Sequence, residues 1–132
     1  MRRLATGLGL AITLLCATSH AHGQKATEQY IPIGQSPGIS GKYTSLGVIA
    51  EVNLRDQTIT IADPAGAKTV KITGKSRIFL DRTPLKLSNL RGVFADLQKG
   101  RRAEVKYLDP DRRSDSVKSQ IADWVKVEIT QQ

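Results

Sequence analysis

The residue types that most often carry catalysis are scarce in this sequence. Its 132 residues include two histidines, His20 and His22, and one cysteine, Cys16. All three lie near the N-terminus, so a folded domain downstream of them has none for a Ser-His-Asp triad, a thiol nucleophile or a multi-histidine metal centre. Carboxylate pairs are then the remaining route to acid–base catalysis, and a short β-domain offers little room for a cleft. We therefore expect no enzymatic activity.

Two short stretches carry possible metal ligands. A chain that began at residue 20 would read His-Ala-His and could chelate Cu(II), although the same residues also fit the end of a signal peptide. Further along, Asp109, Asp111 and Asp115 take positions 1, 3 and 7 of a calcium-type loop. The loop lacks the ligand at position 5, the glycine at position 6 and the distal glutamate, and two arginines oppose a cation. The sequence therefore predicts a polar turn here, with no metal or other cofactor.

Positive charge is the most informative surface feature. Residues 68–113 hold 13 Lys and Arg against five Asp and Glu, whereas the rest of the chain after residue 21 has five against seven. Such an asymmetry can attract a partner rich in phosphate or carboxylate groups, although a basic face can also serve solubility alone. The candidate anion-binding residues are Arg77, Arg82, Lys99, Arg101, Arg102, Lys106, Arg112 and Arg113.

The elements that position these residues follow two segments of a different kind. Residues 1–21 have a basic start, an apolar stretch shorter than a membrane span and a small-residue cleavage pattern, which is typical of a secretory signal peptide. Residues 22–45 are rich in Gly, Ser and Pro and predict an extended leader, in which Tyr30, Ile31 and Ile33 are candidates to lie on the domain surface. We therefore expect a periplasmic or secreted protein whose folded domain spans residues 46–132.

The domain sequence alternates like β-strands separated by turn residues. Residues 47–54, 58–63 and 68–73 predict three antiparallel strands, and 77–81 a further strand or a continuation. Leu90, Phe94 and Leu97 recur at helical spacing before Gly100, which predicts a short helix, and residues 103–107 and 124–130 predict two more strands. The order favours an all-β fold with one short helix, namely a five-stranded OB-like Greek-key barrel with the helix between strands 3 and 4. The predicted core consists of Ile59, Ile61, Val70, Ile72, Ile78, Leu80, Phe94, Leu97, Val105, Val125, Val127 and Ile129.

The stretches GVIAEVN, QTITIAD, KTVKITGKSRIFLD, FADLQKGRRAEVKY and ADWVKVEI also carry a resemblance. Over about residues 46–130 the chain resembles a family of small exported bacterial domains of unknown function with an OB-like barrel. Its L-x-x-G-x-x-V-x-V motif matches from Leu97 to Val105, with Ala103 where the pattern has valine. The resemblance implies the fold and supplies no activity.

Aromatic residues bear on the choice of partner. Phe79 and Trp124 are out of phase with their inward neighbours, so either could be exposed and serve as an interface anchor, whereas Trp124 could also cover one end of the barrel. So few rings do not form the stacking platform that single-stranded nucleic acid requires. We therefore expect a non-enzymatic binding module that engages an anionic envelope component through its basic surface. The alternative is a protein–protein adaptor or structural envelope component that uses Trp124 and Phe79.

Overall fold

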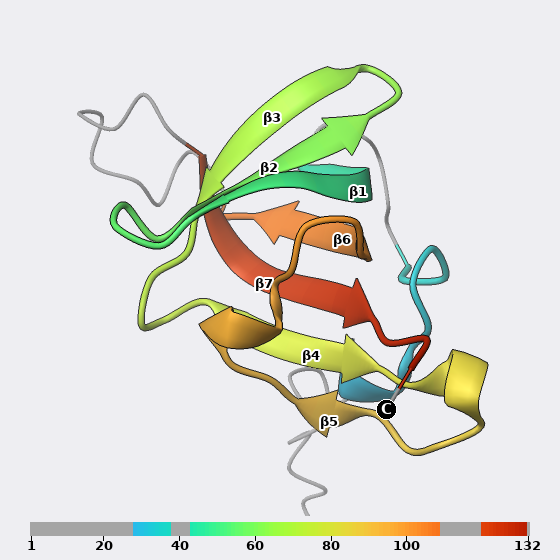
Figure 1. Cartoon of the computed structure of the whole chain (residues 1–132). Coiled ribbons are helices and arrows are strands. Elements are labelled where there is room, and N and C mark those ends of the chain that lie inside the picture. The colour runs from blue at the N-terminus through green and yellow to red at the C-terminus, as the bar shows by residue number, and fades with distance from the viewer. Residues whose placement is uncertain (1–27, 38–42, 109–119, 132) are drawn as a thin grey trace, which may run out of the picture.

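The computed structural model describes residues 28–37, 43–108 and 120–131 (Figure 1). The expected signal peptide, parts of the leader and the 109–119 loop with Arg112 and Arg113 lie outside the described residues. The described chain forms one seven-stranded sheet and three single turns of 3-10 helix. The strands are β1 (Thr44–Asn53), β2 (Thr58–Asp63), β3 (Gly66–Lys71), β4 (Arg77–Asp81), β5 (Leu90–Arg91), β6 (Arg102–Tyr107) and β7 (Gln120–Glu128). The turns are η1 (Glu28–Tyr30), η2 (Thr83–Leu85) and η3 (Phe94–Asp96).

Five of these strands close into a ring in the order β1-β2-β3-β7-β6. Every neighbouring pair in the ring is antiparallel except β3 and β7, which are parallel. Strand β4 also runs parallel to β7. Strand β3 pairs with Gln120 and Ile121 at the start of β7, and β4 pairs with β7 from Trp124 onward. Of the two possibilities left open for residues 77–81, the structure therefore shows a separate strand, and β5 adds a short outer edge to β4.

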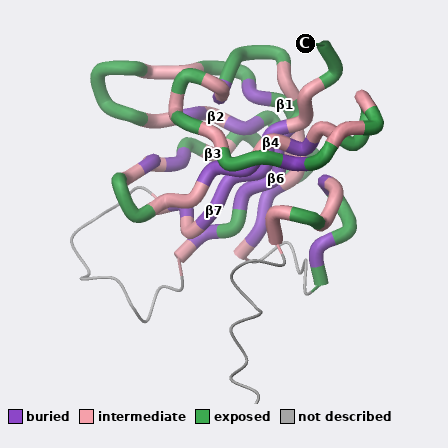
Figure 2. Tube along the Cα trace, turned by 90° about the horizontal axis from the view of Figure 1, so that it is seen from below, coloured by how far each residue is buried: buried purple, intermediate pink, exposed green. Residues whose placement is uncertain are grey.

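The ring encloses the core that the alternation of the sequence predicted. Ile59, Ile61, Val70 and Val105 are at most 1% exposed, and every member of the predicted core set is buried or packs against the buried cluster. The innermost strands, β6 and β7, are buried along most of their length (Figure 2). Period-two patterning is thus sufficient here to identify the inward face.

A close approach between β1 and β2 requires a glycine. A Cβ atom on Gly47 would lie 2.1 Å from the carbonyl oxygen of Ala62 on β2. No side chain can occupy that space unless the two backbones move apart.

The predicted helix between strands is wrong. Residues 90–91 form β5, and Gly92 donates its backbone N–H to the carbonyl of Ile78 on β4 at 2.9 Å. The side-chain oxygen of Asn89 accepts a hydrogen bond from the backbone N–H of Arg82 at 2.8 Å. Pairing with β4 therefore uses the first half of the segment, and only the single turn η3 remains before β6.

The range assigned to an extended leader also differs in the structure. Strand β1 begins at Thr44, within that range, and residues 28–37 pack against the sheet. Ile33 is 6% exposed and Ser36 is 7% exposed, whereas Tyr30 remains 69% exposed. We call residues 28–37 the covering segment, because they contact side chains on the outer face of β4, β6 and β7.

Candidate functional site

The outer face of β4, β7 and β6 brings together charged and aromatic side chains in rows. Residues that alternate away from the core lie opposite one another across the three strands. The first row is Arg77, Trp124 and Lys106, the second is Phe79, Lys126 and Glu104, and the third is Asp81, Glu128 and Arg102. Three of the candidate cations thus share this face with three carboxylates, one lysine and two aromatic rings that the sequence could not place together.

The covering segment docks on these rows through its backbone. Ile33 donates its N–H to Asp81 Oδ2 at 2.9 Å, and Gly34 donates its N–H to Glu104 Oε2 at 2.9 Å. Glu104 is 0% exposed and Asp81 is 2% exposed. Buried carboxylates that accept backbone N–H groups form strong, charge-assisted hydrogen bonds. These two contacts fix the register of a segment that has little regular structure of its own.

Lys126 is the central cation of this face and is also fully buried. Its Nζ donates to Ser36 Oγ at 3.2 Å and lies 3.6 Å from Glu28 Oε2, so both partners come from the covering segment. The same nitrogen lies 4.9 Å from the centre of the Trp124 ring. Burial lowers the pKa of Lys126 below its ordinary value, and nearby carboxylates, Glu104 foremost, oppose that shift. A buried ammonium therefore depends on its neighbouring acids.

Phe79 and Trp124 point away from the core, as their phase predicts, but neither is exposed. Phe79 is 1% exposed and Trp124 is 2% exposed. The guanidinium groups of Arg91 and Arg77 lie 5.1 and 6.0 Å from the Phe79 ring centre, within reach of a cation–π interaction. The sequence could not show this burial, because the phase of a residue within a strand does not reveal whether other parts of the chain cover that face.

The candidate anion-binding cations occupy several elements. Arg77 is half-buried and forms a salt bridge to Asp123 at 3.3 Å, and Arg82 follows β4. Arg101 donates to the backbone carbonyl of Asp96 at 2.8 Å, which holds its side chain along η3. Arg102 contacts Glu128 at 3.5 Å and keeps a side-chain exposure of 46%. Lys99 and Lys106 are exposed. The stretch from Lys99 to Lys106 therefore contributes the densest group of accessible cations among these candidates.

Several carboxylates in the described residues are engaged by the backbone. Four of them accept hydrogen bonds from backbone N–H groups, and two of these four, Asp81 and Glu104, are buried. The acceptor and its donors are Asp63 with Leu46 and Ala65, Asp81 with Ile33 and Thr83, Asp96 with Val93, and Glu104 with Gly34. The hydrogen bond from Ala65 in particular holds the pKa of Asp63 below its ordinary 3.8.

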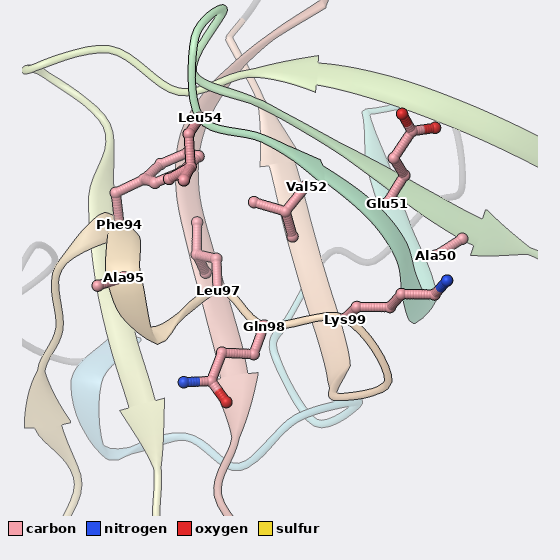
Figure 3. A pocket seen from close by; sticks show the side chains of 9 residues that line it. All are labelled: Ala50, Glu51, Val52, Leu54, Phe94, Ala95, Leu97, Gln98 and Lys99. Carbon is pink, nitrogen blue, oxygen red and sulfur yellow. The ribbon is translucent and has the colours of Figure 1, made fainter.

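A second candidate site is an apolar groove of about 410 Å³ between the end of β1 and the segment around η3 (Figure 3). Figure 3 shows Leu54 and Phe94 at one end of the groove and Lys99 extending beside Ala50 at the other. The groove is lined by Ala50, Glu51, Val52, Leu54, Phe94, Ala95, Leu97, Gln98 and Lys99. The sequence did not predict this groove, because a helix was expected where the structure has the single turn η3.

Metal ligands do not gather in the part of the chain that the structure describes. Within residues 28–37, 43–108 and 120–131, no three His, Cys, Asp or Glu side chains are placed to share an ion. The aspartates at 109, 111 and 115 and the His-Ala-His stretch lie outside those ranges. No helix in the described ranges has the length and apolarity to cross a membrane.

Comparisons with known proteins give only remote matches. No family model matches the chain, and no curated protein matches it. Among solved structures, a tryptophan-to-alanine variant of CusF from Escherichia coli with Cu(II) is 12% identical, with a TM-score of 0.42, over 64% of this chain and 89% of that one. CusF from the same organism with Ag(I) is 13% identical, with a TM-score of 0.41 and the same coverage. The copper and silver are bound in the CusF structures and are not assigned to this chain.

The sequence missed Lys126 and Glu104, the two charges at the centre of the covered face. Their positions in the strands gave them the phase of solvent-facing residues. A signal was nevertheless present, because the same phase carries Phe79 and Trp124, and large aromatic rings are rarely left in water in the middle of a sheet. Aromatic residues in the outward phase of two neighbouring strands, β4 and β7, indicate a second layer.

Proposed function

We propose that this protein is an exported, non-enzymatic binding module that engages an anionic partner through exposed cations, chiefly those between Lys99 and Lys106. The observation that carries the proposal is an imbalance at the surface. Among the described residues, the exposed acids are Glu51 and Asp56, whereas the exposed bases are Arg55, Lys75, Lys86, Arg91, Lys99, Arg102 and Lys106.

The burial of Asp81 and Glu104 contributes to this imbalance. Between residues 98 and 107 the sequence has four cations and one acid, and that acid, Glu104, is fully buried beneath the covering segment. The surface field near β6 is therefore more positive than composition suggests, which raises the local concentration of an anionic partner. Exposed ion pairs are individually weak, so useful affinity requires a partner with several charges.

The fold and compartment are consistent with such a module. The ring order, with its parallel closure between β3 and β7, supports the OB-like topology inferred from the sequence. Export rests on residues 1–21, and the absence of enzymatic activity rests on the sequence positions of the histidines and the cysteine. In the periplasm or outside the cell, an acidic polysaccharide or a phosphorylated envelope component fits this description.

Two other functions have less support. An adaptor that uses Trp124 and Phe79 would need accessible rings, and both rings are buried. Binding of Cu(I) or Ag(I) favours thiolate and thioether ligands. The chain has one methionine, Met1, and one cysteine, Cys16, and both lie outside the described residues.

Titration with fluorescein-labelled dextran sulfate at low and high salt tests the proposal. We expect saturable binding that weakens at least tenfold as salt rises, because exposed charges are screened over about 10 Å at 0.1 M ionic strength. The triple variant K99Q/R102Q/K106Q should lose at least tenfold in affinity at low salt.

The matched control removes the same amount of charge elsewhere. The variant R55Q/K75Q/K86Q loses three exposed cations from three separate turns and should weaken binding less than threefold. Equal losses in the two triple variants would show that the charge acts without a site. Binding that is insensitive to salt would refute the electrostatic proposal altogether.

A further inference from the structure

The apolar groove is a consequence of how the ring is closed. After Ile49 the inward row of β1 continues as Val52 and then reaches Leu54, past the segment that pairs with β6. Among the described residues, the segment of η3 covers this side and is anchored by Leu97, 2% exposed. Because that segment is a single turn rather than a helix, it leaves the end of the apolar row open, and Leu54 stays 70% exposed.

The walls and the rim of the groove differ in chemistry. Six lining residues are apolar, namely Ala50, Val52, Leu54, Phe94, Ala95 and Leu97. The charged or polar members are Glu51, Gln98 and Lys99. A volume of about 410 Å³ falls within the range of small-molecule sites, in which apolar walls hold the body of the ligand and a few polar groups orient it.

Backbone hydrogen bonds hold the two walls at a fixed separation near the Lys99 end. Gly100 donates its N–H to the carbonyl of Ile49 at 2.8 Å, and Ile49 donates its N–H to the carbonyl of Arg101 at 2.9 Å. Lys99 is thereby placed directly beside this clamp, at the end of the groove from which the exposed cations of β6 continue. The groove thus runs from an open apolar end to a cationic end.

We propose that this groove binds the hydrocarbon chain of a single-chain anionic amphiphile, such as a fatty acid, with the head group at Lys99. The choice of an anionic head rests on the proposed function, whereas the choice of a hydrocarbon chain rests on the walls of the groove alone. Glu51 lies next to Ala50, at the same end of the groove as Lys99 (Figure 3), so its carboxylate opposes an anionic head group there. Lys99 should therefore strengthen the binding of an anionic amphiphile and Glu51 should weaken it, and variants of the two residues separate these effects.

Isothermal titration of the purified protein with octanoate and decanoate, both below their micelle concentrations, measures the role of the chain. Burying one methylene group contributes about 0.8 kcal/mol, so decanoate should bind roughly tenfold more tightly than octanoate. L54S removes an apolar wall from an exposed position, and A50F fills the groove. Each should weaken decanoate binding at least fivefold while leaving the affinity for dextran sulfate unchanged.

The head group is tested separately. K99Q should weaken decanoate binding about two- to fivefold, the range of an exposed ion pair, and E51Q should strengthen it within the same range. Decyltrimethylammonium, with an equal chain and a cationic head, should bind at least fivefold more weakly than decanoate. Methyl NMR signals of Val52 and Leu97 should shift on titration with decanoate.

The outcomes distinguish this inference from the proposed function. Dextran sulfate binding without decanoate binding would overturn the amphiphile site and leave the polyanion module in place. Decanoate binding that A50F and L54S do not weaken would place the ligand elsewhere and also overturn it. Equal affinity for decanoate and decyltrimethylammonium would refute the anionic head. Decanoate binding by a wild-type protein that does not bind dextran sulfate would refute the proposed function alone.

Discussion

The replacement of Glu104 by glutamine tests the covered face most directly. Glutamine keeps the size of the side chain but removes the charge that accepts the Gly34 N–H and opposes the desolvation of Lys126. Loss of one partner from a buried charge pair costs about 3–5 kcal/mol. Glu28 still contacts Lys126 at 3.6 Å in this variant, so we expect the lower end, about 3 kcal/mol.

Differential scanning calorimetry near neutral pH measures this effect. At about 4 °C per kcal/mol for a chain of this size, the melting temperature of E104Q should fall by roughly 12 °C. E51Q is the matched control, because it makes the same chemical change at an exposed position of β1 and should alter stability by less than about 0.5 kcal/mol. Hydrogen exchange of the Gly34 amide should accelerate more than that of Ile33, which is bonded to Asp81.

A double variant distinguishes lost charge balance from lost packing. Apolar replacement of a whole buried charge pair is often neutral, so E104L/K126M should recover at least half of the stability that E104Q loses. A melting temperature for E104Q within about 2 °C of wild type would refute the reasoning, since that corresponds to about 0.5 kcal/mol. A double variant less stable than E104Q would show that packing, and not charge, dominates this face.

Three further predictions concern the closed ring. G47A should lower the free energy of unfolding by at least about 2 kcal/mol in urea titration, because its Cβ would clash with β2, whereas G74A, with open space, should be neutral. Since the folded-state pKa of Asp63 lies below 3.8, its stabilisation is present above about pH 4 and is lost as pH falls through the folded pKa; D63N should therefore flatten the acid limb of the stability–pH curve. Burial raises the pKa of Tyr107, which shares a buried 2.6 Å hydrogen bond with Ser45, so absorbance titration of wild type should show a tyrosine ionising above pH 10 that Y107F lacks.

The strands and the inward face of this domain were predictable because their signal is local. Ile59 and Ile61, or Val125 and Val127, reveal their shared face through spacing in the chain alone. The helix was predicted wrongly because Leu90, Phe94 and Leu97 fit a helical period, whereas the actual structure depends on pairing with β4. Pairing of this kind is a contact with a distant strand, and the periodicity of a single segment does not reveal it.

The sequence by itself determined the succession of strands, the identity of the core and the scarcity of catalytic side chains. Only the tertiary structure decided that Lys126, Glu104, Phe79 and Trp124 are buried, since burial of an outer face depends on whether a distant segment covers it. It also decided which charges remain at the surface, because carboxylates such as Glu104 and Asp81 accept hydrogen bonds from backbone far away in the chain. Composition fixes how many charges a chain carries, and folding selects those that a partner can reach.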